Sequence, residues 1–120
     1  MKKVYPSAEA ALDEAREMFD GDEAVVQQLI QVFLRDHERT IADVQRAAAG
    51  LDYKSLGEVG HAVKGSVGLF CARRAIEAAC RLEELATARD PQAATGQSQA
   101  LVSELKLLAQ ALRGEVTDGV

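Results

Sequence analysis

Aromatic residues and prolines are scarce in this sequence. It has no tryptophan, and its three phenylalanines and two tyrosines make up 4% of a chain that is 48% hydrophobic. Alanine and leucine supply much of that hydrophobic fraction, which suits close helix packing and argues against a β-sandwich rich in valine, isoleucine and aromatic residues. The two prolines, Pro6 and Pro91, leave a long middle segment without helix breakers. The composition therefore favours an all-α fold.

Excess positive charge, paired cysteines and long hydrophobic runs are also lacking. The net charge is -5, and no lysine or arginine cluster is long enough to cover a nucleic-acid backbone. No apolar run approaches the length of a membrane span, and the N-terminus lacks the apolar segment of a signal peptide. Cys71 and Cys80 are expected to be free thiols of a reducing compartment. We therefore expect a cytoplasmic protein that binds neither nucleic acid nor a membrane.

The chain of 120 residues fits a single domain with one hydrophobic core. Capping and turn residues predict helices at about 7–19, 22–49, 52–69, 72–88 and 90–114, with a frayed tail at 115–120. Gly50 is expected to end the second helix as its C′ residue. The expected N-caps are Ser7, Asp22, Asp52 and Asp90, the last followed by Pro91 at the first helical position.

The four longer helices are amphipathic and are joined by short connections. In the last one, Leu101, Leu105, Leu108 and Leu112 repeat with spacings of 4, 3 and 4 and form one apolar stripe. No segment alternates with the period of a strand. These features predict an antiparallel, up-and-down four-helix bundle over residues 22–113, with the short N-terminal helix packed across it.

The two histidines occupy opposite kinds of position on their helices. His37 lies four residues after Phe33 and four before Ile41, inside the apolar stripe of the second helix, and is expected to be a packed core residue. His61 points roughly 140–150° away from the apolar stripe of the third helix and is expected to face solvent.

Glycines surround His61 on the solvent side of its helix. Gly57, Gly65 and Gly68 lie at i-4, i+4 and i+7, and Lys64 lies at i+3. Since a glycine inside a helix costs about 1 kcal/mol relative to alanine, the arrangement suggests that something large approaches His61 closely. A convex, exposed imidazole suits the active site of another protein better than a small molecule, which prefers a concave pocket. Gly60, near the apolar stripe, is expected to allow a close helix contact instead.

The stretch "HAVKGSVGLFCA", residues 61–72, resembles the signature of histidine-containing phosphotransfer (HPt) domains, approximately His-x-Leu-Lys-Gly-Ser-x-x-x-Leu-Gly-Ala. His61, Lys64, Gly65, Ser66 and Ala72 match it outright. The segments "LIQVFLRDHERTIADV" and "ACRLEELA" resemble the helices before and after it, so that the likeness covers roughly residues 22–113.

The resemblance implies that His61 carries the phosphoryl group. Its Nε2 would accept that group from an aspartyl phosphate in a receiver domain and pass it to a second receiver, as a phosphorelay intermediate. Lys64 would offset phosphate charge, and Gly65 would give the receiver loops room. Ser66 would support the helix through a hydroxyl–backbone bond or by packing, and Gly57 and Gly68 would extend the open surface.

The resemblance also indicates which partners and cofactors to expect. Mg²⁺ is expected in the receiver, and no cofactor is expected in this chain. The resemblance also implies a monomer, which is the usual state in the family. Lys54, two turns from His61, is a candidate for the rim of the site. Cys71 stands where the family usually has glycine, and since a left-handed conformation would strain a cysteine, we expect the turn to be helical or otherwise rearranged.

Two other functions remain open from the sequence. The chain could be the phosphotransfer domain of a chemotaxis-type or hybrid histidine kinase, phosphorylated by its kinase domain; it has no glycine-rich nucleotide site, so no autonomous kinase activity is expected. It could also be a helical bundle that binds a partner without transferring phosphate. A metal-binding bundle is disfavoured, because two histidines on opposite faces lack the paired Glu/His pattern of such sites.

Overall fold

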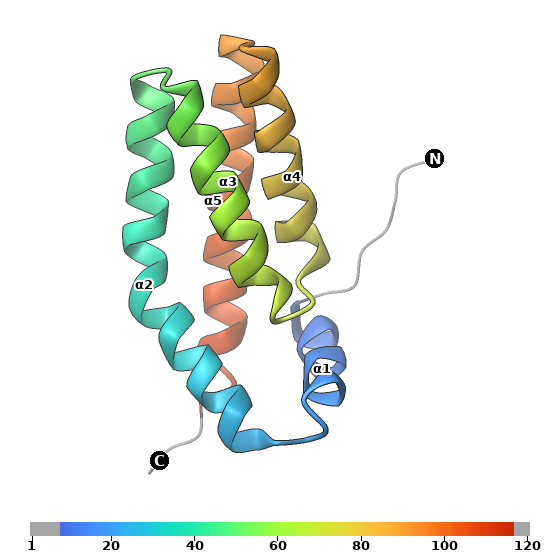
Figure 1. Cartoon of the computed structure of the whole chain (residues 1–120). Coiled ribbons are helices and arrows are strands. Elements are labelled where there is room, and N and C mark those ends of the chain that lie inside the picture. The colour runs from blue at the N-terminus through green and yellow to red at the C-terminus, as the bar shows by residue number, and fades with distance from the viewer. Residues whose placement is uncertain (1–7, 117–120) are drawn as a thin grey trace.

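The computed structural model describes residues 8–116, which form five helices and no strand. The helices are α1 (Ala8–Met18), α2 (Glu23–Ala49), α3 (Tyr53–Gly68), α4 (Arg73–Ala88) and α5 (Pro91–Arg113) (Figure 1). The predicted all-α fold is confirmed. Ser7, the predicted first N-cap, lies outside the described residues.

Helices α2 to α5 run alternately up and down and lie side by side as a four-helix bundle (Figure 1). Contacts link α2 to α3, α3 to α4, α4 to α5 and α5 back to α2, which closes the ring around one core. All five helices contribute to that core, because each has an apolar stripe that must be buried. The largest fully buried side chains are Leu12, Ile30, Leu56, Leu82, Leu101, Leu105 and Leu112.

Three helices begin at aspartate N-caps, as the sequence predicts. The carboxylates of Asp22, Asp52 and Asp90 accept hydrogen bonds from the backbone N–H groups three residues ahead, at 3.3, 3.1 and 3.1 Å. Each carboxylate satisfies an amide that has no partner within its helix. Pro91 fills the first position of α5, where its missing N–H costs no hydrogen bond.

Helix α2 ends at Ala49, as predicted, but Gly50 does not have its predicted role as the C′ residue. Gly50 is not the left-handed C′ residue, because its φ is -87°; Leu51 takes that place with φ 49°. The Asp52 N–H donates to the Ala47 carbonyl at 2.9 Å, and the Leu51 N–H donates to Ala48 at 3.1 Å, which completes a Schellman motif. The helix stop therefore relies on backbone hydrogen bonds and tolerates a leucine where glycine would fit best.

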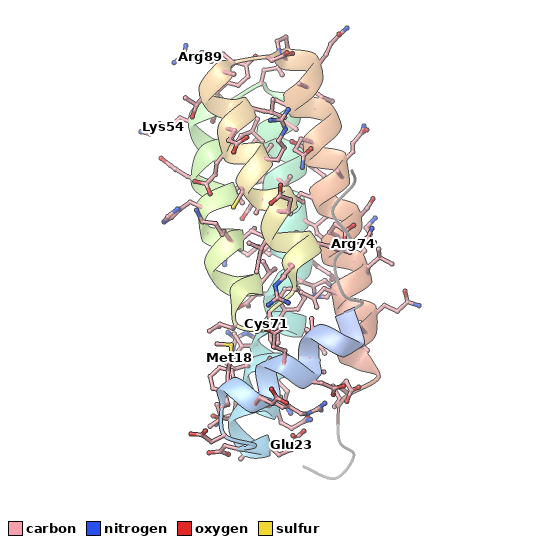
Figure 2. The ribbon with its side chains drawn as sticks, turned by 90° about the vertical axis from the view of Figure 1, so that its right-hand side faces the viewer. Met18, Glu23, Lys54, Cys71, Arg74 and Arg89 are labelled. Carbon is pink, nitrogen blue, oxygen red and sulfur yellow. The ribbon has the colours of Figure 1, made fainter. Side chains whose placement is uncertain are left out.

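The turn between α3 and α4 also differs from the expectation. Cys71 is left-handed, with φ 52°, so the turn keeps the conformation that a glycine would take and is not rearranged. The N–H groups of Cys71 and Ala72 donate to the carbonyls of Gly68 and Val67. Burial of the Cys71 side chain compensates for the strain, since its thiol packs in the core and donates to the Met18 thioether sulfur at 3.1 Å (Figure 2).

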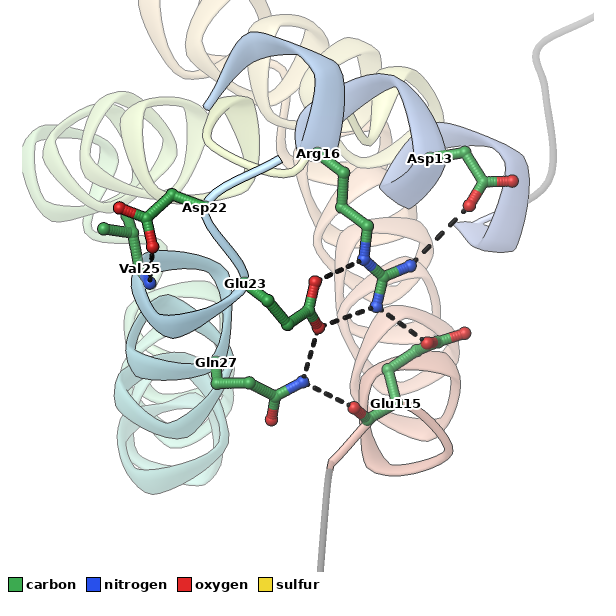
Figure 3. Close-up of polar contacts among 7 residues, drawn as sticks. All are labelled: Asp13, Arg16, Asp22, Glu23, Val25, Gln27 and Glu115. Carbon is green, nitrogen blue, oxygen red and sulfur yellow. Dashed lines mark hydrogen bonds and ion pairs between the residues drawn. The ribbon is translucent and has the colours of Figure 1, made fainter. Parts of the chain in front are cut away.

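Helix α1 covers one end of the bundle and is held there by Arg16 (Figure 3). The Arg16 guanidinium bonds the Glu23 carboxylate at 3.1 Å and the Glu115 carboxylate at 2.9 Å. Gln27 donates to the Glu23 carboxylate and to the Glu115 carbonyl. The predicted frayed tail therefore does not begin at residue 115, because Glu115 is tied to α1 and α2; residues 117–120 lie outside the described part of the chain.

Candidate functional site

His61 stands on the outer face of α3. Its side chain is 76% exposed, while Leu56, Val63 and Val67 on the opposite face of the helix are buried. The apolar stripe therefore faces the bundle and turns the imidazole to solvent, as its spacing predicts. The Nε2 atom of His61 makes no hydrogen bond to any residue that the structure describes.

A carboxylate from α4 lies beside His61 and was not predicted. Glu83 Oε2 is 3.6 Å from His61 Nδ1, an ion-pair distance that is longer than a hydrogen bond. Glu83 Oε1 is 3.0 Å from the Lys64 Nζ, and this pairing raises the pKa of Lys64. The three side chains form a connected polar cluster in which an acidic group lies between the imidazole and the ammonium group.

The four glycines of α3 fall into two groups. A Cβ added at Gly57, Gly65 or Gly68 would meet no heavy atom within 4 Å, so the packing of the bundle does not require glycine there. A Cβ at Gly60 would lie 3.2 Å from the Ala79 carbonyl oxygen and 3.1 Å from Glu83 Cγ. Gly60 therefore allows α4 to approach α3, as expected, and that close approach brings Glu83 to His61.

Two open grooves border α3, one toward α2 and one toward α4, and the second contains His61. The groove toward α2 includes the apolar side chains of Val32, Val59 and Ala62. Its polar lining includes Ser66, which is exposed and does not make the expected hydroxyl–backbone bond within the described residues. The groove toward α4 includes His61 and Glu83 together with the basic residues Lys54 and Arg89.

His37 is buried, as its place in the apolar stripe of α2 predicts, although it is among the residues that line the α2–α3 groove. It is buried and stacks on Phe33 with ring centroids 5.8 Å apart. Its Nδ1 lies 2.7 Å from the Leu34 carbonyl oxygen, and its Nε2 lies 3.3 Å from Arg113 Nη2. Since the carbonyl can only accept and the guanidinium can only donate, these partners assign the proton to Nδ1 and leave Nε2 as the acceptor.

The described residues form neither a metal centre nor a membrane span. Within 8–116, no three His, Cys, Asp or Glu side chains gather in a group that could hold a metal ion. In the same part of the chain, none of the helices combines the length and the apolar character needed to cross a membrane. Cys71 is buried and burial raises the pKa of its thiol, which leaves it protonated near neutral pH.

Comparison with known proteins gives the family. Searches of curated proteins and of solved structures found no match. A family model described as the Hpt domain matches residues 28–115, which include most of α2 and all of α3, α4 and α5. Members of this family interact with receiver domains in phosphorelays. The match covers well over half of the chain, and the chain therefore belongs to the Hpt domain family, which serves histidine phosphotransfer in two-component signalling.

Proposed function

We propose that His61 is the phosphoacceptor of this domain, and that it takes a phosphoryl group from a receiver aspartate and passes it to another receiver. The observation that supports this most directly is the contrast in access between the two histidines. His61 has an exposed Nε2 without a bonding partner among the described residues, whereas His37 is buried with both ring nitrogens engaged.

The transfer needs a neutral imidazole with a free lone pair, which histidine supplies near pH 7 without a separate base. The Nε2 lone pair attacks the phosphorus of the aspartyl phosphate. The N–P bond forms, the P–O bond to the aspartate breaks, and the aspartate leaves as a carboxylate. The ring then carries a positive charge with its proton on Nδ1, and Glu83, 3.6 Å from that nitrogen, stabilises the charge.

Lys64 and the open glycines complete the proposed site. Phosphoryl transfer depends mainly on positioning and on cations around the spread negative charge of the transition state. Lys64 supplies one cation from this chain, and Mg²⁺ in the receiver would supply another. Gly65, Gly57 and Gly68 leave the backbone bare around the imidazole, so that receiver loops can reach it. In this proposal the chain binds no cofactor of its own.

The groove between α2 and α3 supplies an apolar surface beside the phosphoacceptor. Val32 on α2 is 46% exposed, although it is a large aliphatic residue, and it lies in the same groove as Val59 and Ala62. An exposed apolar patch next to a reactive group is typical of a protein–protein contact. We assign this groove to the docking of the receiver.

The test is phosphoryl transfer from purified receivers. Receiver domains encoded in the same genome are phosphorylated with a small-molecule acyl phosphate, mixed with the protein and Mg²⁺, and analysed for acid-labile, base-stable phosphate. Wild type and His37→Gln are expected to become labelled, and His61→Gln is expected to remain unlabelled while folded by circular dichroism. Label on folded His61→Gln would assign the phosphoryl group elsewhere. A folded wild-type protein that accepts nothing from any receiver would contradict the phosphorelay function.

A further inference from the structure

Two basic residues in the groove that contains His61 form no ion pair within 4 Å, unlike most basic residues in the part of the chain that the structure describes. Arg16, Arg35, Arg46, Lys64, Arg73, Arg74 and Arg81 each form an ion pair within 4 Å. Within residues 8–116 no such pair involves Lys54 or Arg89, and both line the α3–α4 groove that contains His61. Their side chains extend outward at the same end of the bundle (Figure 2).

The stability of the helices does not explain Lys54 and explains Arg89 only in part. Lys54 is the second residue of α3, and a cation in the first turn of a helix is repelled by the positive end of the helix dipole. Arg89 follows α4 in a left-handed conformation with φ 54°, which favours glycine or asparagine. The charge of Arg89 suits the C-terminus of α4, but a side chain at that backbone conformation does not.

The acidic groups around these two residues are mostly occupied. Asp52 and Asp90, their neighbours in sequence, accept hydrogen bonds from the first turns of α3 and α5. Glu83 is paired with Lys64. Glu58 also lines the groove, one helical turn after Lys54 on α3, but forms no ion pair within 4 Å with either basic residue. In a chain with a net charge of -5, Lys54 and Arg89 therefore keep positive charges on the α3–α4 groove that are unpaired within residues 8–116, alongside one carboxylate without an ion pair, Glu58, and can meet whatever approaches His61.

We propose that Lys54 and Arg89 form a cationic rim that recognises a carboxylate-bearing loop at the edge of the receiver's phosphorylation site. This inference rests on the proposed function and adds to it the feature by which a receiver is selected. Charges at the rim of an interface act mainly on association rate and partner choice, because they attract an oppositely charged surface before contact. The α2–α3 groove provides apolar contact, and the cationic rim on the other side of His61 fixes the orientation of the receiver.

The test compares three charge reversals that change the net charge equally. Lys54→Glu and Arg89→Glu alter the rim, and Lys106→Glu alters an exposed lysine of α5 that also has no ion pair and does not line the groove. The rate of transfer from a phosphorylated receiver is measured at low receiver concentration, in about 50 mM and about 500 mM NaCl, since salt screens such attractions. At low salt each rim variant is expected to be about tenfold slower than Lys106→Glu, with convergence at high salt.

The outcomes separate this inference from the proposed function. Rim variants that are no slower than Lys106→Glu, or that are equally slow at both salt concentrations, would overturn the cationic rim and leave His61 as phosphoacceptor. A wild-type protein that takes up no phosphoryl group would overturn the proposed function itself. In the expected case, changing one exposed carboxylate of the receiver to lysine restores the rate of the Lys54→Glu or Arg89→Glu variant.

Discussion

The two histidines of this protein show how the surroundings of an imidazole determine what the imidazole can do. His37 and His61 belong to adjacent helices of one bundle, and both have an acidic or carbonyl oxygen near Nδ1. At His37 a partly buried contact with the Arg113 guanidinium also engages Nε2, which leaves no lone pair for attack on phosphorus. At His61 the same nitrogen is open to solvent. The difference lies in the second nitrogen, and it makes one histidine structural and the other available for chemistry.

The residues around the two imidazoles differ in the same way. Phe33 stacks on His37 and meets Phe70, in the turn after α3, edge to face at 5.7 Å, so that rings fill the space between α2 and this turn. Around His61, Gly57, Gly65 and Gly68 leave the helix surface bare. Phe33 and His37 also line the α2–α3 groove assigned to receiver docking, so substitutions near His37 should change stability more than transfer. Substitutions near His61 should change transfer more than stability.

The largest effect is expected for His37→Ala. Removing a buried ring that stacks on Phe33 and bonds Leu34 and Arg113 leaves a cavity and removes both hydrogen bonds of the ring, which should lower the free energy of unfolding by about 2–4 kcal/mol. Urea unfolding followed by circular dichroism measures this. His61→Ala is the control, with an expected change within about 0.5 kcal/mol. The comparison is wrong if the two variants lose the same stability, or if folded His37→Ala no longer accepts phosphate.

Gly65→Gln should slow transfer about tenfold, because a long side chain would occupy the space through which the receiver reaches His61. Gly96→Gln is the matched control, since Gly96 also lies in a helix with nothing within 4 Å of an added Cβ, but on α5. Both variants should gain about 0.5–1 kcal/mol of stability from helix propensity. Equal transfer rates for the two variants would show that the glycines around His61 do not serve access.

Glu83→Gln should lower the maximum rate of transfer several-fold with little change in the receiver concentration needed for half of that rate. The neutral amide cannot stabilise the positive charge that develops on the ring, an effect of about 1 kcal/mol at a partly exposed site. Glu84→Gln, which changes an exposed carboxylate paired with Arg81, is the control. A Glu83→Gln protein with the wild-type maximum rate would show that Glu83 only holds Lys64.

The sequence predicts much of the contrast between His37 and His61, but not all of it. Asp22, Asp52 and Asp90 mark helix starts through hydrogen bonds within one turn, and the apolar stripes assign His37 inward and His61 outward from spacing alone. Glu83 escaped prediction because its role depends on the rotation and separation of α3 and α4, which are determined by packing at Gly60. Local periodicity contains no information about which residues of two different helices meet.

The left-handed conformations of Leu51 and Cys71 were also not predicted from the local sequence. Substitutions at these two residues are expected to have the smallest effects. Each ends a helix in a conformation that glycine adopts without strain, so Leu51→Gly, at an exposed side chain, should gain about 0.5–1 kcal/mol. Cys71→Gly should gain less, because burial of the thiol against Met18 is lost and offsets the relief. Urea unfolding compares the two variants, and phosphoryl transfer by Cys71→Gly should match wild type. A change in that transfer rate would mean that the turn at Cys71 controls His61, ten residues away, and that the separation between a structural and a chemical region does not hold.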